Sequence, residues 1–186
     1  MKLKVWSKTL LSIYNCLFGL SKEIDKIILS YGLKSGFYNG ISNTFRDVEK
    51  MIELTDRKVT FINLKVLIEK TLCSLDDLSC KILILKYCDR MSNETIIEAL
   101  NLKKRTYFRK INNAISGFSS ELLMKGFCED KIIKLLKEET WIIEIFNDLY
   151  KKEKENKVDE CEITKIAIYN KALKDLRQKR RISAFI

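Results

Sequence analysis

The stretch that decides the fold is residues 74–124, SLDDLSCKILILKYCDRMSNETIIEALNLKKRTYFRKINNAISGFSSELLM. It contains three segments, residues 75–88, 92–100 and 103–118, whose apolar residues recur at the spacing of a helix. Short polar connections separate the segments. A helix, a turn of about three residues and a longer basic helix form the layout of a helix-turn-helix. The stretch therefore predicts an all-α fold built around such a unit.

Start and stop signals support these boundaries. Ser74, with Asp77 three residues later, is arranged as a capping box for the first helix. Ser92 is an N-cap residue for the second, because its hydroxyl can accept a hydrogen bond from a backbone N–H. Asn101 tolerates the left-handed conformation that ends many helices. The sequence therefore predicts a tight turn between the second and third helices.

The third segment carries an apolar face and a cationic face. We expect Tyr107, Ile111, Ala114 and Phe118 to pack inward, since they recur at helical spacing. No acidic residue lies between Glu98 and Glu121. Clustered cations favour binding to a polyanion such as duplex DNA, whereas the alternative is an ordinary solvated helix face. The residues expected to contact DNA are Lys103, Lys104, Arg105, Thr106, Arg109, Lys110 and Asn112.

Individual roles follow from side-chain chemistry. Arg105 and Arg109 lie four residues apart, on one face of a helix, and each can bind either a guanine edge or a phosphate. Asn112 has the amide needed to recognise adenine, and Thr106 has a hydroxyl that can contact a phosphate. Phe108 belongs to a second apolar stripe, so its alternatives are a core position or contact with a thymine methyl group.

This segment also resembles a known family. Residues 87–115, YCDRMSNETIIEALNLKKRTYFRKINNAI, are similar to the helix-turn-helix of the fourth region of bacterial sigma factors and of related phage late-gene regulators. The chain departs from the family pattern at Ile97, Asn101 and Lys103. The matching residues are Leu83, Tyr87, Met91, Ser92, Glu94, Ile96, Leu100, Thr106 and Ala114.

The resemblance implies a bacterial or phage transcription regulator that binds specific double-stranded DNA, with RNA polymerase as a further partner. Two alternatives stay open. One is a helical protein–protein interaction module without DNA binding, and the other is a divergent small sigma factor. No match to a second sigma region is found in residues 1–72.

Helical patterns also fill the flanking segments. Residues 1–31 predict one or two helices with a break near Gly19 and Ser21, and residues 32–42 predict a loop. Residues 43–72 predict a long helix with two apolar stripes, to be buried between neighbours or in a homodimer. We expect residues 1–72 to form a module for oligomerisation or partner binding, followed by a DNA-binding domain over residues 73–126.

Residues 127–186 complete the predicted organisation as a helical segment with a basic end. Gly126 is expected to end the preceding helix. One helix is expected to follow from about residue 129 to 150, then a charged joint over 151–160 and a last helix over 162–178. The cluster Lys179, Arg180 and Arg181 suits a helix C-terminus and equally suits phosphate contact.

Composition narrows the functional classes. The 186 residues have a net charge of +10, no Pro and no His. The six Cys form no C-x-x-C pair, so we expect reduced thiols in a cytoplasmic protein and no metal site. No apolar run approaches the ~20 residues of a membrane span. Without a phosphate loop, a nucleophile motif or paired acids in an apolar setting, we expect neither an enzyme nor a cofactor. The pairs Asp76–Asp77 and Glu138–Glu139 suit helix starts or the surface.

Overall fold

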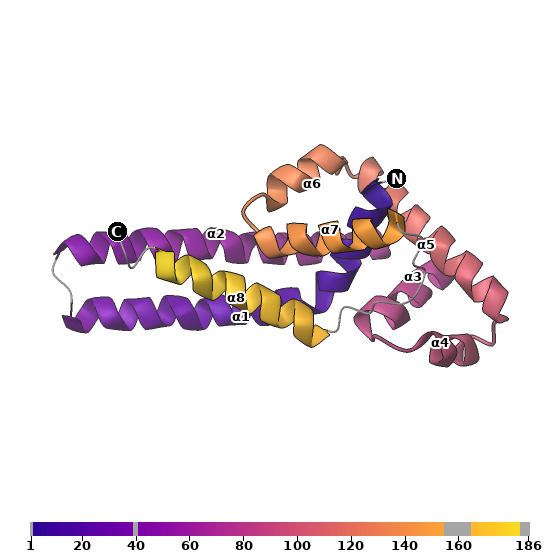
Figure 1. The fold of residues 1–186 in the computed structure, drawn as a ribbon, viewed down its shortest axis with the longest axis horizontal. Helices are drawn as coiled ribbons and strands as arrows, with labels where there is room; N and C mark the ends of the chain where they lie inside the picture. The colour runs from indigo at the N-terminus through magenta and orange to yellow at the C-terminus, as the bar shows by residue number, and fades with distance from the viewer. Residues whose placement is uncertain (1, 39–40, 155–164, 183–186) are drawn as a thin grey trace.

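The computed structural model describes residues 2–38, 41–154 and 165–182, and these residues form an all-α protein (Figure 1). Side-chain environments are described for residues 2–33, 44–154 and 166–176. The helices of the described ranges are α1 Lys2–Tyr38, α2 Ile41–Leu72, α3 Asp77–Leu83, the π-helix η1 Ile84–Cys88, α4 Asn93–Ala99, α5 Lys104–Met124, α6 Glu129–Leu136, α7 Thr140–Lys154 and α8 Lys165–Ile182. The predicted fold class is confirmed.

The two longest helices, α1 and α2, form an antiparallel hairpin that extends to one side of the molecule (Figure 1). Of the two predicted alternatives for residues 1–31, one helix or two helices broken near Gly19 and Ser21, the structure has one helix, because α1 continues through both residues. A Cβ at Gly19 would lie 3.2 Å from the ring of Tyr169 on α8, so the glycine permits a close helix approach. The loop predicted at 32–42 is wrong over residues 32–38 and 41–42, which are helical.

Helix α1 is the central element of the core. Its apolar residues from Val5 to Ile24 are buried except for Tyr14 and Phe18, and α2, α5, α7, α8 and η1 all pack on α1. Trp6 stacks on Phe146 of α7, with ring centroids 4.1 Å apart, and Phe61 of α2 meets the edge of Trp141. Large aromatic side chains thus join the hairpin to the C-terminal helices.

The two apolar stripes of α2 have different environments. Phe61, Leu64, Ile68 and Leu72 are buried in the core. The other stripe is between 39% and 70% exposed; it consists of Phe45, Val48, Ile52, Val59, Ile62 and Val66. Neighbouring helices within the described chain therefore cover only one of the two predicted stripes.

The single helix predicted from residue 129 to 150 is two helices, α6 and α7. The break places Glu139 at the start of α7, where it is 2% exposed. Its carboxylate accepts hydrogen bonds from Arg57 Nε at 2.7 Å and from Trp141 Nε1 at 2.9 Å. Of the two positions predicted for Glu139, a helix start or the surface, the helix start is confirmed. The residue is buried there because a buried guanidinium pairs with it, whereas Glu138 is exposed.

Helix α8 packs on the hairpin through Ile168, Ala172 and Leu176. The predicted joint at 151–160 lies outside the described residues beyond Lys154, since α7 continues to that point. The backbone of α8 includes the basic cluster at 179–181, but its side chains also lie outside the described residues. None of the described helices has the length and apolar character needed to cross a membrane.

Candidate nucleic-acid interface

The candidate interface is built by α3, η1, α4 and α5, which lie at the end of the molecule opposite the C-terminal end of α1 (Figure 1). Asp76, not Ser74, caps α3: its carboxylate accepts a 3.0 Å hydrogen bond from the backbone N–H of Ser79. Ser74 instead donates to the carbonyl of Lys70 and accepts from Lys125. The predicted cap is therefore displaced by two residues.

Helix α1 holds the connection that follows η1. Arg90 there has a φ of 54°, and its guanidinium donates to the carbonyl of Ser12 at 2.8 Å. The amide of Asn15 donates to the carbonyls of Tyr87 at 3.2 Å and Cys88 at 2.5 Å. Carbonyls at a helix end need such partners. These contacts were not predicted, and the polar Asn15 within the apolar pattern of α1 was the available signal for them.

Local chemistry fixes α4 and the turn after it. Ser92 Oγ accepts from the backbone N–H of Thr95, which confirms the predicted N-cap. Asn101 has a φ of 47°, the left-handed conformation expected of it. Its N–H bonds the carbonyl of Glu98, and the next N–H, of Leu102, bonds that of Ile97. These two bonds form a Schellman motif with Asn in the position usually taken by Gly.

Helix α5 is anchored through its buried face. Tyr107, Ile111, Ala114 and Phe118 are all buried, as predicted. The hydroxyl of Tyr107 donates to Asn93 Oδ1 at 2.8 Å, which ties α5 to the first turn of α4. Gly126, with a φ of 79°, ends the helix as expected. The orientation of the opposite face is therefore set by packing and by a buried hydrogen bond.

All the residues predicted to contact DNA are at least partly exposed, and Arg105, Arg109 and Asn112 lie on the face opposite the buried one. Lys103, Lys104, Arg105, Arg109 and Asn112 are exposed, whereas Thr106 and Lys110 are partly exposed. None of the five cations makes an ion pair with another described residue. Lys103 occupies the N-cap position without a side-chain cap. The structure thus brings all seven residues onto the first turns of one helix.

Two carboxylates lie near this face. Hydrogen bonds from the backbone and side chain of Ser79 lower the pKa of Asp76, and the charge of Lys110 adds to the effect. The pKa of Glu94 is also lowered, chiefly by its own backbone N–H and by Ser92, with smaller contributions from Lys104 and Lys86. Both acids are negative at neutral pH, so they partly offset the positive potential at the edges of the face.

Phe108 lies at the border between the two faces of α5. It is 39% exposed, and its ring meets the edge of Tyr107 at a centroid distance of 5.3 Å. A half-buried position leaves part of the ring available for an apolar contact, so the structure does not separate the two predicted roles.

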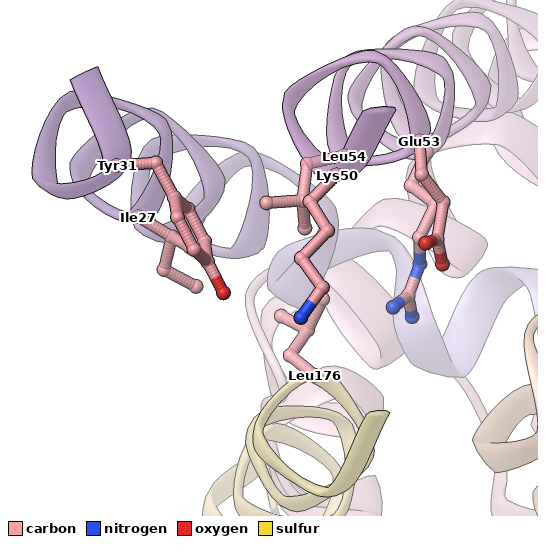
Figure 2. Close-up of a pocket in the computed structure, with 7 residues that line it drawn as sticks. Ile27, Tyr31, Lys50, Glu53, Leu54 and Leu176 are labelled. Atoms are coloured by element: carbon pink, nitrogen blue, oxygen red, sulfur yellow. The ribbon is translucent and has the colours of Figure 1, made fainter. Parts of the chain in front are cut away.

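Elsewhere the described chain has a small pocket at the α1–α2–α8 junction and no cluster of metal ligands. A pocket of about 30 Å³ lies between α1, α2 and α8, comparable to the volume of a single water molecule. Figure 2 shows its labelled lining residues, Ile27, Tyr31, Lys50, Glu53, Leu54 and Leu176. Among the described residues, no three His, Cys, Asp or Glu side chains are grouped as metal ligands would be. Burial raises the pKa of the Cys88 thiol to about 11, which keeps it protonated.

Comparison with known proteins gives one match. Residues 44–119 match the model of a family described as "Protein of unknown function (DUF1492)". The match covers less than half of the chain, from α2 to near the end of α5, and includes every residue predicted to contact DNA. No curated protein and no solved structure matches the chain. The family description names neither sigma factors nor a helix-turn-helix.

Proposed function

We propose that the protein is a transcription regulator that binds specific double-stranded DNA through the exposed face of α5. The observation that carries this proposal is a set of five cations, with no ion-pair partner among the described residues, on the first turns of a helix whose other face is fixed in the core. Cations without internal partners are available to neutralise phosphates and release condensed counterions.

Different residues are assigned to the phosphate contacts that position the protein and to the base contacts that recognise the sequence. Lys103, Lys104 and Lys110 act as point charges toward phosphates, which set affinity and register. Arg105 and Arg109 project from successive turns, and their planar forks suit either a guanine edge or a phosphate. Asn112 lies one turn further along and offers an amide to adenine.

The start of α5 supports phosphate binding in a second way. Its first backbone N–H groups have no acceptor within the helix, and Lys103 supplies no side-chain cap. Such groups, together with the helix dipole, favour an anion at the N-terminus. The α4–α5 turn that carries them lies at the tip of the molecule (Figure 1), where a duplex can approach.

The test is binding to duplex DNA across a salt series. Wild type should bind with a steep salt dependence and prefer one sequence by ~10³ or more. Arg105→Ala/Arg109→Ala should lose that preference and reduce the salt slope by up to about 2. Lys134→Ala/Lys174→Ala removes the same charge from exposed positions on α6 and α8 and should leave binding unchanged.

Other outcomes point to the alternatives. Binding that ignores Arg105 and Arg109 would contradict the proposal and favour a protein–protein interaction module. Copurification with core RNA polymerase would support the partner that the sigma-like resemblance implies. Promoter opening by the protein with core polymerase alone would instead favour a divergent small sigma factor.

A further inference from the structure

The exposed apolar stripe of α2 has the residue spacing of a coiled-coil helix, although no described helix of this chain covers it. Its members, with Thr55, follow one another at alternating intervals of three and four residues: 45, 48, 52, 55, 59, 62 and 66. That is an uninterrupted 3.5-residue repeat over three heptads, with Phe45, Ile52, Val59 and Val66 at a and Val48, Thr55 and Ile62 at d. A sustained a/d repeat is typical of a helix that coils around another helix.

The stripe is open along its whole length. Every apolar member is at least 39% exposed, and the core contacts of α2 come from other residues, such as Phe61 and Leu64. A groove of about 440 Å³ between α1 and α2 continues the stripe, lined by Ile62, Val66 and the exposed Phe18. The apolar surface is therefore wider than one helix face at its C-terminal end.

The amount of surface suits a dimer. A Val, Ile or Phe side chain offers roughly 150–200 Å², so these exposed fractions leave on the order of 500 Å² per copy. Two copies would bury on the order of 1,000 Å², the lower limit for a stable specific interface. Contacts in the adjoining groove would add to this area.

We propose that α2 pairs with α2 of a second copy of this chain, parallel and in register. One flank of the stripe is bordered by α1 across the groove, where Lys58 pairs with Asp25 at 2.6 Å and Lys65 lies over the ring of Phe18. Each α2 therefore has room for one partner helix rather than two. β-Branched residues at three of the four a positions are compatible with parallel pairing.

The residues that meet across the interface favour the parallel arrangement. In register, every apolar residue meets its own counterpart, and Thr55 meets Thr55 of the second copy. The Thr55 hydroxyl already donates to the carbonyl of Met51 at 2.7 Å, so its burial leaves no donor unsatisfied.

An antiparallel pair is less well matched. In the antiparallel register that pairs Ile52 with Ile62, Phe45 meets Glu69 in the core of the interface. At the flanking e and g positions, Asp56 meets Asp56 and Lys58 meets Lys58 of the second copy. Like charges directly opposed are unfavourable. The parallel pair also has two such contacts, Lys65 against Lys70 on each side, so the mismatch of Phe45 with Glu69 is what disfavours the antiparallel pair.

One consequence rests on the proposed function. Parallel pairing places both α5 helices at the same end of the dimer, because α2 runs toward the α3–α5 lobe (Figure 1). Two recognition helices on one side suit a duplex with two half-sites. The dimer itself is tested without DNA, so its failure is distinguishable from failure of DNA binding.

The first test is the mass in solution by sedimentation equilibrium under reducing conditions, from about 1 to about 100 µM. We expect wild type to reach twice the 21.8 kDa of the chain. Ile52→Glu/Ile62→Glu should weaken the dimer by about 100-fold or more, while Leu123→Glu/Ile133→Glu, at exposed positions off the stripe, should not. A wild type that stays monomeric throughout, or a dimer indifferent to the stripe variant, would overturn the proposal.

The second test fixes the orientation without placing charges in the stripe. Under mild oxidation, Thr55→Cys should form a cross-linked dimer above the wild-type level, because parallel pairing brings the two thiols within disulfide reach. Glu53→Cys, exposed on the same helix but off the stripe, is the matched control. A dimeric Thr55→Cys protein that fails to cross-link would overturn the parallel arrangement.

Discussion

Replacing Glu139 with Gln should destabilise the protein far more than the same change at the adjacent Glu138. The Arg57 and Glu139 side chains are 4% and 3% exposed, and Asp175 is 13% exposed. Arg57 reaches both oxygens of Glu139, at 2.7 and 2.8 Å, and Asp175 Oδ2 at 2.9 Å. This network joins α2, the start of α7 and α8, three elements far apart in sequence.

The expected loss of unfolding free energy depends on the donors that Gln at position 139 cannot accept from. Whichever way the amide is oriented, its nitrogen faces a donor, either Arg57 Nε or the pair Arg57 Nη2 and Trp141 Nε1. Burial lowers the pKa of Arg57, but the hydrogen bonds and charge of Glu139 and Asp175 raise it overall, so this guanidinium stays charged. Breaking such a buried pair costs about 3–5 kcal/mol, and we expect about 3 because Asp175 remains.

Urea unfolding followed by far-UV circular dichroism measures this cost. With a slope of about 2 kcal/mol/M, the midpoint of Glu139→Gln should fall by about 1.5 M. Glu138 pairs with Lys137 at 4.0 Å in an exposed position, so Glu138→Gln should change the unfolding free energy by less than ~0.5 kcal/mol. Equal midpoints for the two variants would refute the assignment of Glu139 to a buried network.

Three further predictions concern the candidate interface. Asn101→Val should cost about 1–2 kcal/mol of unfolding free energy, because a β-branched residue is strained at a φ of 47°, whereas Asn101→Gly should be tolerated; thermal melts compare them. Tyr107→Phe should cost about 1–3 kcal/mol in urea unfolding, because it leaves the buried Asn93 carbonyl without its donor. The pKa of Asp76 is lowered chiefly by the backbone N–H of Ser79. The cap should therefore stabilise α3 fully at a pH above the ordinary carboxyl pKa, and this stabilisation should be lost as the pH falls through the lowered pKa. An NMR titration of Asp76 should give a midpoint below about 3.9.

Locally encoded features could be predicted from the sequence. Ser92, Asn101 and Gly126 act through hydrogen bonds or backbone angles within a few residues of themselves, and all three have the predicted roles. The buried face of α5 also follows from spacing alone. Arg105, Arg109 and Asn112, three of the residues predicted to contact DNA, lie on the opposite face for the same reason, although their binding stays a prediction.

Features that depend on distant partners could not be predicted. Glu139 has the charge of a surface residue, and only Arg57, 82 positions away in sequence, makes its burial favourable. Residues 32–38 contain glycines that weaken a helix by about 1 kcal/mol each, yet α1 continues there beside α2. Nor does spacing reveal which stripe of α2 faces the core, since both have helical periodicity.

Selection from a pool of random duplexes tests the central claim most directly, because the operator sequence emerges from the selection itself. Wild type should enrich one sequence motif, and Arg105→Ala/Arg109→Ala, handled identically, should enrich none or lose specified positions within it. Lys134→Ala/Lys174→Ala should recover the wild-type motif. Enrichment of the same motif by wild type and the α5 variant, or of no motif by wild type, would contradict the assignment of α5 as the helix that reads DNA.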